Sequence, residues 1–194
     1  MQKTDGLPSV FFLSRLFTPA AASKPSMHPS EVLFQGTCLP VSIPVCDHYA
    51  GSEKLMRKSL ALQHELGPVF DITFDCEDGA AHGNEEAHAH LIGSLLADPE
   101  QNRFGRIGVR VHDIGSPFFE KDVAIVLEHA AQQVAYLVVP KVNSAQDARD
   151  AVERINRLAT PLGRSSLPVH VLIESHGSLT DVHAIAALPQ VECL

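Results

Sequence analysis

The stretch VFDITFDCEDG, residues 69–79, decides how this chain folds. A run of strand-forming residues ends at Phe74, and acidic residues closed by a glycine follow it. Three later apolar runs are also followed by charged residues, namely Arg110, Lys141 and Glu174. A helical pattern follows each run, so the strands are expected to be parallel and their carboxyl ends to share one rim. A rim that carries acids, an arginine and a lysine is typical of the active-site face of a β/α barrel.

Hydrophobic periodicity predicts alternating strands and helices from about residue 39 onward. The strands are expected at residues 41–45, 69–74, 107–111, 135–139 and 169–173, with a sixth beginning at residue 191. The helices are expected at residues 52–66, 84–97, 116–131, 144–159 and 178–188, the first capped by Ser52 and the fourth by Ser144. These units recur at a spacing of roughly thirty residues, the length of a compact strand–helix unit.

The fold class is therefore α/β, a (β/α)₈ barrel of which this chain carries about the first five to six βα units. Residues 1–38 are expected to form a largely irregular N-terminal tail, and residues 39–194 the partial barrel that is the catalytic domain. A closed barrel needs about 250 residues, whereas this chain has 194, so an open doubly wound sheet is the alternative. The segment CDHYAG at residues 46–51 lacks the GxGxxG pattern of dinucleotide-binding folds, which weakens that alternative.

Composition fits one globular α/β domain, with 45% hydrophobic and 20% charged residues. The net charge of -8 argues against a nucleic-acid surface. The four cysteines show no metal-binding spacing, and they are expected to be reduced in a cytoplasmic protein. No apolar run is long enough to span a membrane.

Polar residues at the strand ends are the candidate site. The three carboxylates of residues 75–79 suit a Mg²⁺ ligand set, although a solvated acidic turn closed by Gly79 explains them equally well. Glu174 follows an apolar strand directly, which favours a functional role over the cost of a buried acid. The planar fork of Arg110 suits a substrate carboxylate, and an internal ion pair with one of the acids is the alternative.

Five short motifs in order resemble those of the HpcH/HpaI aldolase and citrate lyase β-subunit family, from about Leu39 to Leu194. They are FDCEDG at 74–79 (similar to DLEDG), RVH at 110–112 (similar to RIN), VPKV at 139–142 (PKV), IESHG at 173–177 (similar to IET-x-G) and the helix DVHAIA at 181–186.

The resemblance implies a TIM barrel that makes or breaks C–C bonds with Mg²⁺ as cofactor. It implies that Glu174 is the first metal ligand and that Arg110 contacts a substrate carboxylate or carbonyl oxygen. Glu77 and Asp78 would bind metal-coordinated water or orient the site. The resemblance also implies a homo-oligomer, a trimer or larger. With less support, Lys54 and Arg57 near the start of the first helix would face a CoA phosphate.

The chain departs from the family pattern at three places. His112 replaces the Asn of RIN and Ser175 the Thr of IET, which puts the substrate in doubt more than the reaction class. The family's second metal ligand, an Asp at the end of the sixth strand, is expected beyond Leu194. The chain is therefore interpreted as C-terminally truncated.

The leading hypothesis is a Mg²⁺-dependent carbon–carbon lyase that cleaves a hydroxyacid, carried as a CoA thioester such as citryl-CoA or malyl-CoA, through a metal-stabilised enolate. One alternative is a CoA-independent aldolase that acts on a 4-hydroxy-2-oxo acid. Another is an inactive truncated fragment that acts only in binding or assembly. A zinc site built from the eleven histidines is disfavoured, because His88 and His90 point to different helix faces and no HExxH is present.

Overall fold

The computed structural model describes residues 43, 44 and 46–194. The predicted N-terminal tail, residues 1–38, lies outside the described residues. Six strands form one sheet, β1 (Asp47–Ala50), β2 (Asp71–Asp75), β3 (Ile107–Arg110), β4 (Leu137–Val139), β5 (Val169–Val171) and β6 (Val191–Cys193). The helices are α2 (Glu53–Leu66), α3 (Glu85–Ala97), α4 (Phe119–Ala130), α5 (Ala145–Ala159), η1 (Thr160–Leu162), α6 (His176–Thr180) and α7 (Val182–Ala186).

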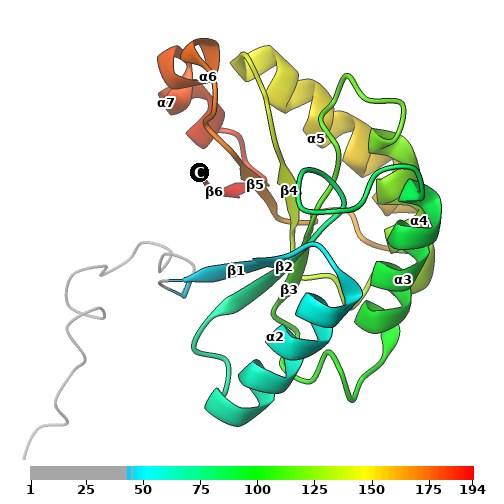
Figure 1. Cartoon of the computed structure of the whole chain (residues 1–194). Helices are drawn as coiled ribbons and strands as arrows, with labels where there is room; N and C mark the ends of the chain where they lie inside the picture. Colours follow the sequence, from blue (N-terminus) through cyan, green and yellow to red (C-terminus); the bar gives the residue numbers. More distant parts are fainter. Residues whose placement is uncertain (1–42, 45) are drawn as a thin grey trace, which may run out of the picture. The chain divides into compact units, whose positions relative to one another are not determined.

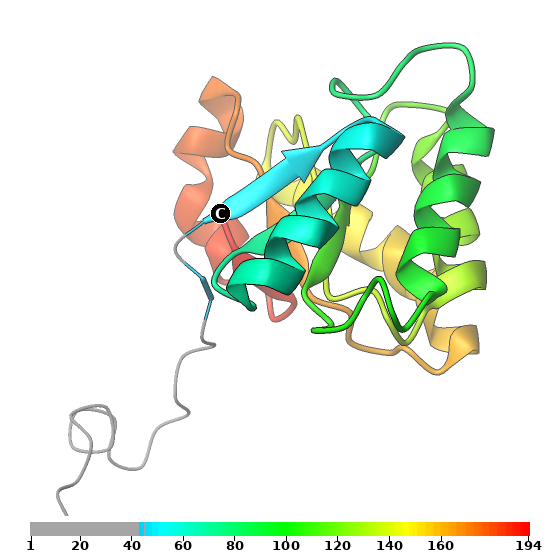
Figure 2. The same ribbon diagram turned by 60° about the horizontal axis from the view of Figure 1, so that its bottom comes forward.

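The strands pair in sequence order, β1-β2-β3-β4-β5-β6, and every neighbouring pair is parallel. In a doubly wound sheet the strand order reverses at a switch point, so some consecutive strands are not neighbours. A β/α barrel instead adds each strand beside the one before it. The sheet curves, and α2, α3, α4 and α5 cover its outer face (Figures 1 and 2). The predicted fold class, part of a β/α barrel, is confirmed.

The sequence of β2 explains how the sheet has both an apolar and a polar face. Ile72 and Phe74 are fully buried in the core that the strands share with the helices. Successive side chains of a strand point to opposite faces, so Asp71, Thr73 and Asp75 point into the concave interior. Thr73 Oγ1 lies 2.7 Å from Asp47 Oδ2 in that interior. The same alternation that builds the core therefore delivers a carboxylate to the end of the strand.

The first predicted strand, residues 41–45, is wrong in position. The described residues 43 and 44 are not in a strand, and β1 begins at Asp47, which is in register with Asp71. Pro44 has no N–H to give to a ladder, and the pairing starts only where Cys46 O accepts the N–H of Asp71 at 3.0 Å.

The predicted helix at residues 178–188 is also corrected, because two short helices replace it. Ser175 caps α6 with a capping box closed by Ser178. The carboxylate of Asp181, which stands between α6 and α7, accepts the N–H of Ala145 at the start of α5. This anchor coincides with the break between the two helices. The predicted N-caps Ser52 and Ser144 are confirmed. No helix among the described residues is long and apolar enough to cross a membrane.

Gly108 on β3 leaves room for the ring of Tyr136. A Cβ atom at residue 108 would lie 2.1 Å from Tyr136 Cε2. The ring cannot easily retreat, because it stacks on His170 with centroids 3.9 Å apart and its hydroxyl lies 3.0 Å from Thr73 Oγ1.

Gly108→Ala is expected to lower the free energy of unfolding by about 1–3 kcal/mol, the usual cost of overpacking a core. In a Tyr136→Ala background the same change is expected to cost much less, because the ring is gone. Urea unfolding of the wild type, the two single variants and the double variant measures the cost of Gly108→Ala in each background. An equal cost in the two backgrounds would contradict this account of Gly108.

Candidate active site

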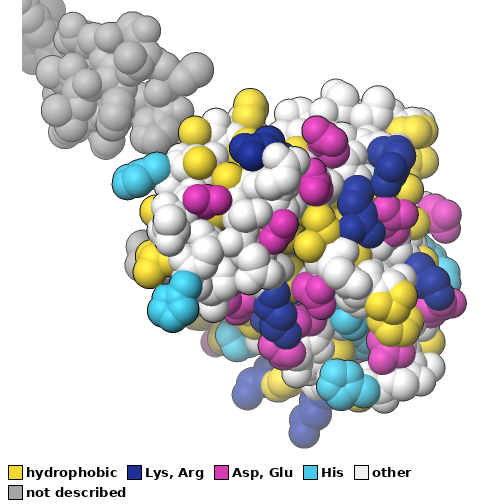
Figure 3. Space-filling view, turned by 90° about the horizontal axis from the view of Figure 1, so that it is seen from above, with side chains coloured by type: hydrophobic (Ala, Val, Ile, Leu, Met, Phe, Trp, Pro, Cys, Tyr) yellow, Lys and Arg dark blue, Asp and Glu magenta, His cyan; other side chains and the backbone are white. Residues whose placement is uncertain are grey.

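The carboxyl ends of β2 and β3 and the loops after β4 and β5 meet at one rim. Figure 3 looks down on the molecule from above the view of Figure 1, the side on which these ends lie. Acidic and basic side chains are interspersed with apolar ones over that face. The rim is therefore a mixed surface, and specific pairs of residues decide its chemistry.

Asp75 and Arg110 form the buried base of the rim. Arg110 donates from Nε to Asp75 Oδ1 at 2.8 Å and from Nη2 to Asp75 Oδ2 at 2.6 Å. The side chains are only 12% and 3% exposed. Tyr49 places its ring 5.3 Å from the Arg110 guanidinium carbon. This bidentate geometry fixes the arginine in place.

Asp75 also organises the turn that follows it. Its two carboxylate oxygens accept the backbone N–H groups of Glu77 at 2.9 Å and of Gly79 at 2.8 Å. Burial by itself raises the pKa of the Asp75 carboxyl, but hydrogen bonds from Arg110 and from these two N–H groups outweigh it. The pKa lies below its ordinary value, so Asp75 is ionised at neutral pH.

Glu77 extends the cluster from Arg110 toward solvent. Its side chain is 6% exposed, and its Oε2 lies 3.3 Å from Arg110 Nη1. That oxygen is buried yet accepts no hydrogen bond. Its other oxygen, Oε1, accepts a hydrogen bond from the Lys141 ammonium. The same ammonium lies 3.1 Å from Oδ1 of Asp78, whose side chain is 63% exposed.

Lys141 connects these acids to Glu174. Its backbone N–H donates to Glu174 Oε2 at 2.9 Å. Its φ of 55° makes it the only non-glycine residue with a positive φ among the described residues. This conformation is uncommon for a side chain of this size and persists where the surroundings fix it. Lys141 thus contacts acids that follow two different strands.

The structure brings together four of the predicted site residues. Glu77, Asp78, Arg110 and Glu174 form one chain of contacts through Lys141. The ammonium of Lys141 is thus paired with Glu77 and Asp78.

Lys54 and Arg57 are not part of this chain of contacts. Arg57 pairs with Glu53 at 2.7 Å on the exposed face of α2, and Lys54 is exposed nearby. Among the described residues, neither side chain forms a hydrogen bond or ion pair with Glu77, Asp78 or Glu174. Their role toward a CoA phosphate stays a prediction.

Sequence reasoning missed the part that Asp75 plays. The signal was available, because an acid two residues beyond Thr73 must share the interior face of β2. Tyr49 was missed because the first strand was placed too early in the chain.

The histidines serve other contacts. His112 Nδ1 lies 2.6 Å from Asp122 Oδ2, and the same oxygen accepts the backbone N–H of His112 at 3.0 Å. His88 Nε2 lies 2.9 Å from the backbone oxygen of Asp75. Within residues 46–194, no group of three or more His, Cys, Asp or Glu side chains is placed to hold a metal ion. The protein side chains described here therefore offer an incomplete metal shell.

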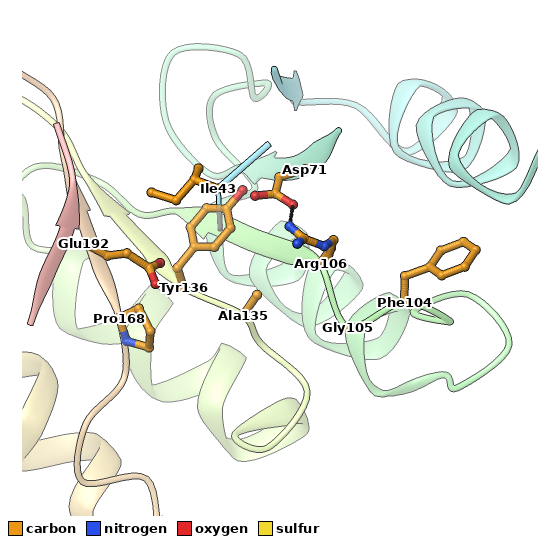
Figure 4. A pocket seen from close by; sticks show the side chains of 9 residues that line it. All are labelled: Ile43, Asp71, Phe104, Gly105, Arg106, Ala135, Tyr136, Pro168 and Glu192. Carbon is orange, nitrogen blue, oxygen red and sulfur yellow. Dashed lines mark hydrogen bonds and ion pairs between the residues drawn. The ribbon is translucent and has the colours of Figure 1, made fainter. Parts of the chain in front are cut away.

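A pocket lies at the opposite end of the strands from this rim. It has a volume of about 300 Å³ and is lined by residues that precede β3, β4 and β5, including Arg106, Tyr136 and Pro168. Figure 4 shows the Asp71–Arg106 ion pair and the Tyr136 ring facing it. The amino-terminal face of a β/α barrel serves stability, whereas catalysis uses the carboxyl-terminal rim. We therefore place the candidate site at the rim.

The oxygen-rich rim suits a hard divalent cation. Glu77 Oε2 is a buried carboxylate oxygen without a hydrogen-bond partner. Glu77 and Asp78, which follow β2, and Glu174, which follows β5, supply oxygen donors that all lie in contact with Lys141. Mg²⁺ usually takes only one or two carboxylates and completes its shell with water and substrate oxygens. The residues present fit such an ion, with Glu174 and Glu77 as the candidate contacts.

The sequence model of the HpcH/HpaI aldolase/citrate lyase family matches residues 65–194. The chain belongs to this family. The predicted family is confirmed.

Two curated relatives are L-malyl-CoA/beta-methylmalyl-CoA lyases. The enzyme of Cereibacter sphaeroides is 28% identical over 118 residues, which cover 60% of this chain and 36% of the relative. The enzyme of Rhodobacter capsulatus is 26% identical over the same shares of both chains. The chain thus spans about a third of the length of the curated relatives that it matches.

Solved structures agree with the fold. A citrate lyase from Burkholderia xenovorans LB400 superposes with a TM-score of 0.74 and 51% identity, over 78% of this chain and 47% of that chain. A malate synthase from Haloferax volcanii superposes with a TM-score of 0.61 at 20% identity, over 76% of this chain and 49% of that chain. At that identity the malate synthase supports the fold alone.

Proposed function

We propose that this chain carries part of the active site of a Mg²⁺-dependent carbon–carbon lyase whose substrate is a hydroxyacid bound as a CoA thioester. The observation that carries the proposal is the rim cluster of Glu77, Asp78, Arg110 and Glu174, joined through Lys141 at the carboxyl ends of parallel strands. Membership of the HpcH/HpaI aldolase/citrate lyase family supports the reaction class.

Metal dependence follows from the donors on the rim. A divalent cation bound there would supply Lewis-acid stabilisation of a substrate oxygen that becomes negative as the C–C bond breaks. Glu174 and Glu77 would hold it. Asp78, which is exposed, suits contact with water around the ion.

Arg110 has a narrower role than a free guanidinium fork would have. Asp75 occupies its Nε and Nη2, and Glu77 lies beside Nη1. An arginine carries five N–H donors, so after the two hydrogen bonds to Asp75 one donor on Nη2 and the two on Nη1, beside Glu77, are left for a substrate oxygen. A charge held rigidly by a buried carboxylate needs no reorganisation as negative charge develops. Arg110 is therefore proposed to stabilise the reacting oxygen by single hydrogen bonds.

The CoA thioester is favoured over a free 4-hydroxy-2-oxo acid because the curated relatives are named as malyl-CoA lyases. Lys54 and Arg57 are proposed to face the CoA phosphates, since they lie in the first two turns of α2, which begins at the same rim. Arg57 would have to leave its exposed partner Glu53, and exposed ion pairs cost little to separate.

An assay on the full-length protein tests the proposal. Malyl-CoA, citryl-CoA and 4-hydroxy-2-oxo acids are supplied separately, with Mg²⁺ or with EDTA, and acetyl-CoA or pyruvate release is followed. We expect Mg²⁺-dependent cleavage of a hydroxyacyl-CoA thioester and loss of activity in EDTA. Cleavage of only the free 4-hydroxy-2-oxo acid would favour the CoA-independent aldolase. Cleavage that survives EDTA would overturn the metal dependence, and no cleavage of any of the three would favour a binding or assembly role.

A further inference from the structure

We infer that Lys141 is an internal counter-ion of the rim, which a divalent cation displaces when it binds. Its ammonium contacts Glu77 and Asp78 and is expected to move into solvent when a cation takes its place. The inference rests on the proposed metal dependence and adds a residue to which no role in metal binding has been assigned.

The two cations of the rim differ in how firmly they are held. Arg110 is 12% exposed and is fixed by two hydrogen bonds to Asp75, so it cannot leave without exposing a buried carboxylate. The side chain of Lys141 is 46% exposed and reaches the acids from the solvent side. An ammonium on a flexible four-carbon stem is the more easily withdrawn of the two groups.

The backbone of Lys141 explains how the side chain can leave without disturbing the site. The N–H of Lys141 holds Glu174 Oε2 at 2.9 Å, and this bond does not depend on the side chain. The left-handed backbone conformation, with φ at 55°, keeps that N–H directed at Glu174. Withdrawal of the ammonium therefore frees Glu77 and Asp78 while Glu174 stays in place.

Charge balance gives the displacement its driving force. Four carboxylates, those of Asp75, Glu77, Asp78 and Glu174, face the two cations Arg110 and Lys141 in this chain of contacts. The ammonium shares Glu77 Oε1 and Asp78 Oδ1, which are oxygens that a divalent cation or its water shell would need. A doubly charged ion compensates these acids better than a singly charged one at the same position.

Mn²⁺ binding to the full-length protein tests the inference, with free Mn²⁺ measured by electron paramagnetic resonance. Lys141→Gln removes the charge and keeps a side chain of similar polarity. We expect the variant to bind Mn²⁺ roughly 5-fold more tightly than the wild type, which corresponds to about 1 kcal/mol. A residue that only supports the fold would leave the affinity unchanged or weaken it.

Lys121→Gln is the matched control, because it removes the same charge from an exposed lysine–glutamate pair between α4 and α3. We expect it to bind Mn²⁺ like the wild type. Equal affinities of Lys141→Gln and wild type, or equal tightening in both variants, would overturn the role of Lys141 and leave the proposed function standing. Absence of Mn²⁺ binding in every protein would overturn both. Lys141→Gly removes the whole side chain, and glycine adopts a positive φ without strain. This variant is expected to bind Mn²⁺ as tightly as Lys141→Gln.

Discussion

Asp75→Ala is expected to lower the free energy of unfolding by about 3–5 kcal/mol, the usual cost of leaving one member of a buried ion pair without its partner. The variant strands the guanidinium of Arg110, which is 12% exposed. It also removes the acceptor for the backbone N–H groups of Glu77 and Gly79. Urea unfolding followed by circular dichroism measures the change.

Asp78→Ala provides the matched control, because Asp78 belongs to the same acidic motif but its side chain is 63% exposed. Exposed ion pairs contribute little, so this variant is expected to unfold nearly like the wild type. An equal loss of unfolding free energy in Asp75→Ala and Asp78→Ala would show that the buried ion pair stabilises the fold no more than the exposed one.

The contribution of Asp75 has a defined pH dependence. Its folded-state pKa lies below the ordinary value of 3.8. The stability that it provides is therefore fully present above about pH 4 and is lost as the pH falls through the folded-state pKa. The difference between wild type and Asp75→Ala is expected to shrink in unfolding experiments below pH 4. A difference that stays constant down to pH 2 would contradict the assigned pairing.

Glu174→Gln is expected to lower kcat of the full-length enzyme by on the order of 100-fold, the upper end of the loss seen when a residue that only supports a metal ligand is changed. The backbone N–H of Lys141 donates to Glu174 Oε2 at 2.9 Å. The side-chain oxygen of a glutamine can accept the same hydrogen bond. It lacks the negative charge that a divalent cation requires. Unfolding by urea is therefore expected to change little while turnover collapses.

Steady-state kinetics over a range of Mg²⁺ concentrations separates the two effects for Glu174→Gln. Glu128→Gln, at an exposed position on α4, is the control for the loss of one negative charge. A wild-type value of kcat in Glu174→Gln would show that Glu174 is not a metal ligand. A large loss of stability in that variant would instead assign Glu174 a structural role.

The sequence was sufficient where local chemistry alone decides the structure. Ser52 and Ser144 mark the starts of α2 and α5 because a serine side chain can accept the free N–H groups of a first helical turn. The rim position of Glu174 followed from one apolar strand and the parallel arrangement of its neighbours.

The sequence was insufficient where packing between distant segments decides. The three acids of residues 75–79 look equivalent in sequence, yet the strand continues through Asp75, so only this acid lies bidentate against Arg110 from the neighbouring strand. The positive φ of Lys141 has no sequence signal, because glycine or asparagine is the usual residue in that conformation. The start of β1 depended on its register with Asp71 and not on the apolar residues before it.

The sequential strand order has a consequence for how the protein is made. Each strand from β2 to β6 pairs with the strand that precedes it in the chain, so none of these five pairings has to wait for a segment synthesised much later. Loop-closure entropy then remains small at every step. The sheet can grow one strand–helix unit at a time as the chain leaves the ribosome, with each new strand added to an edge that already exists.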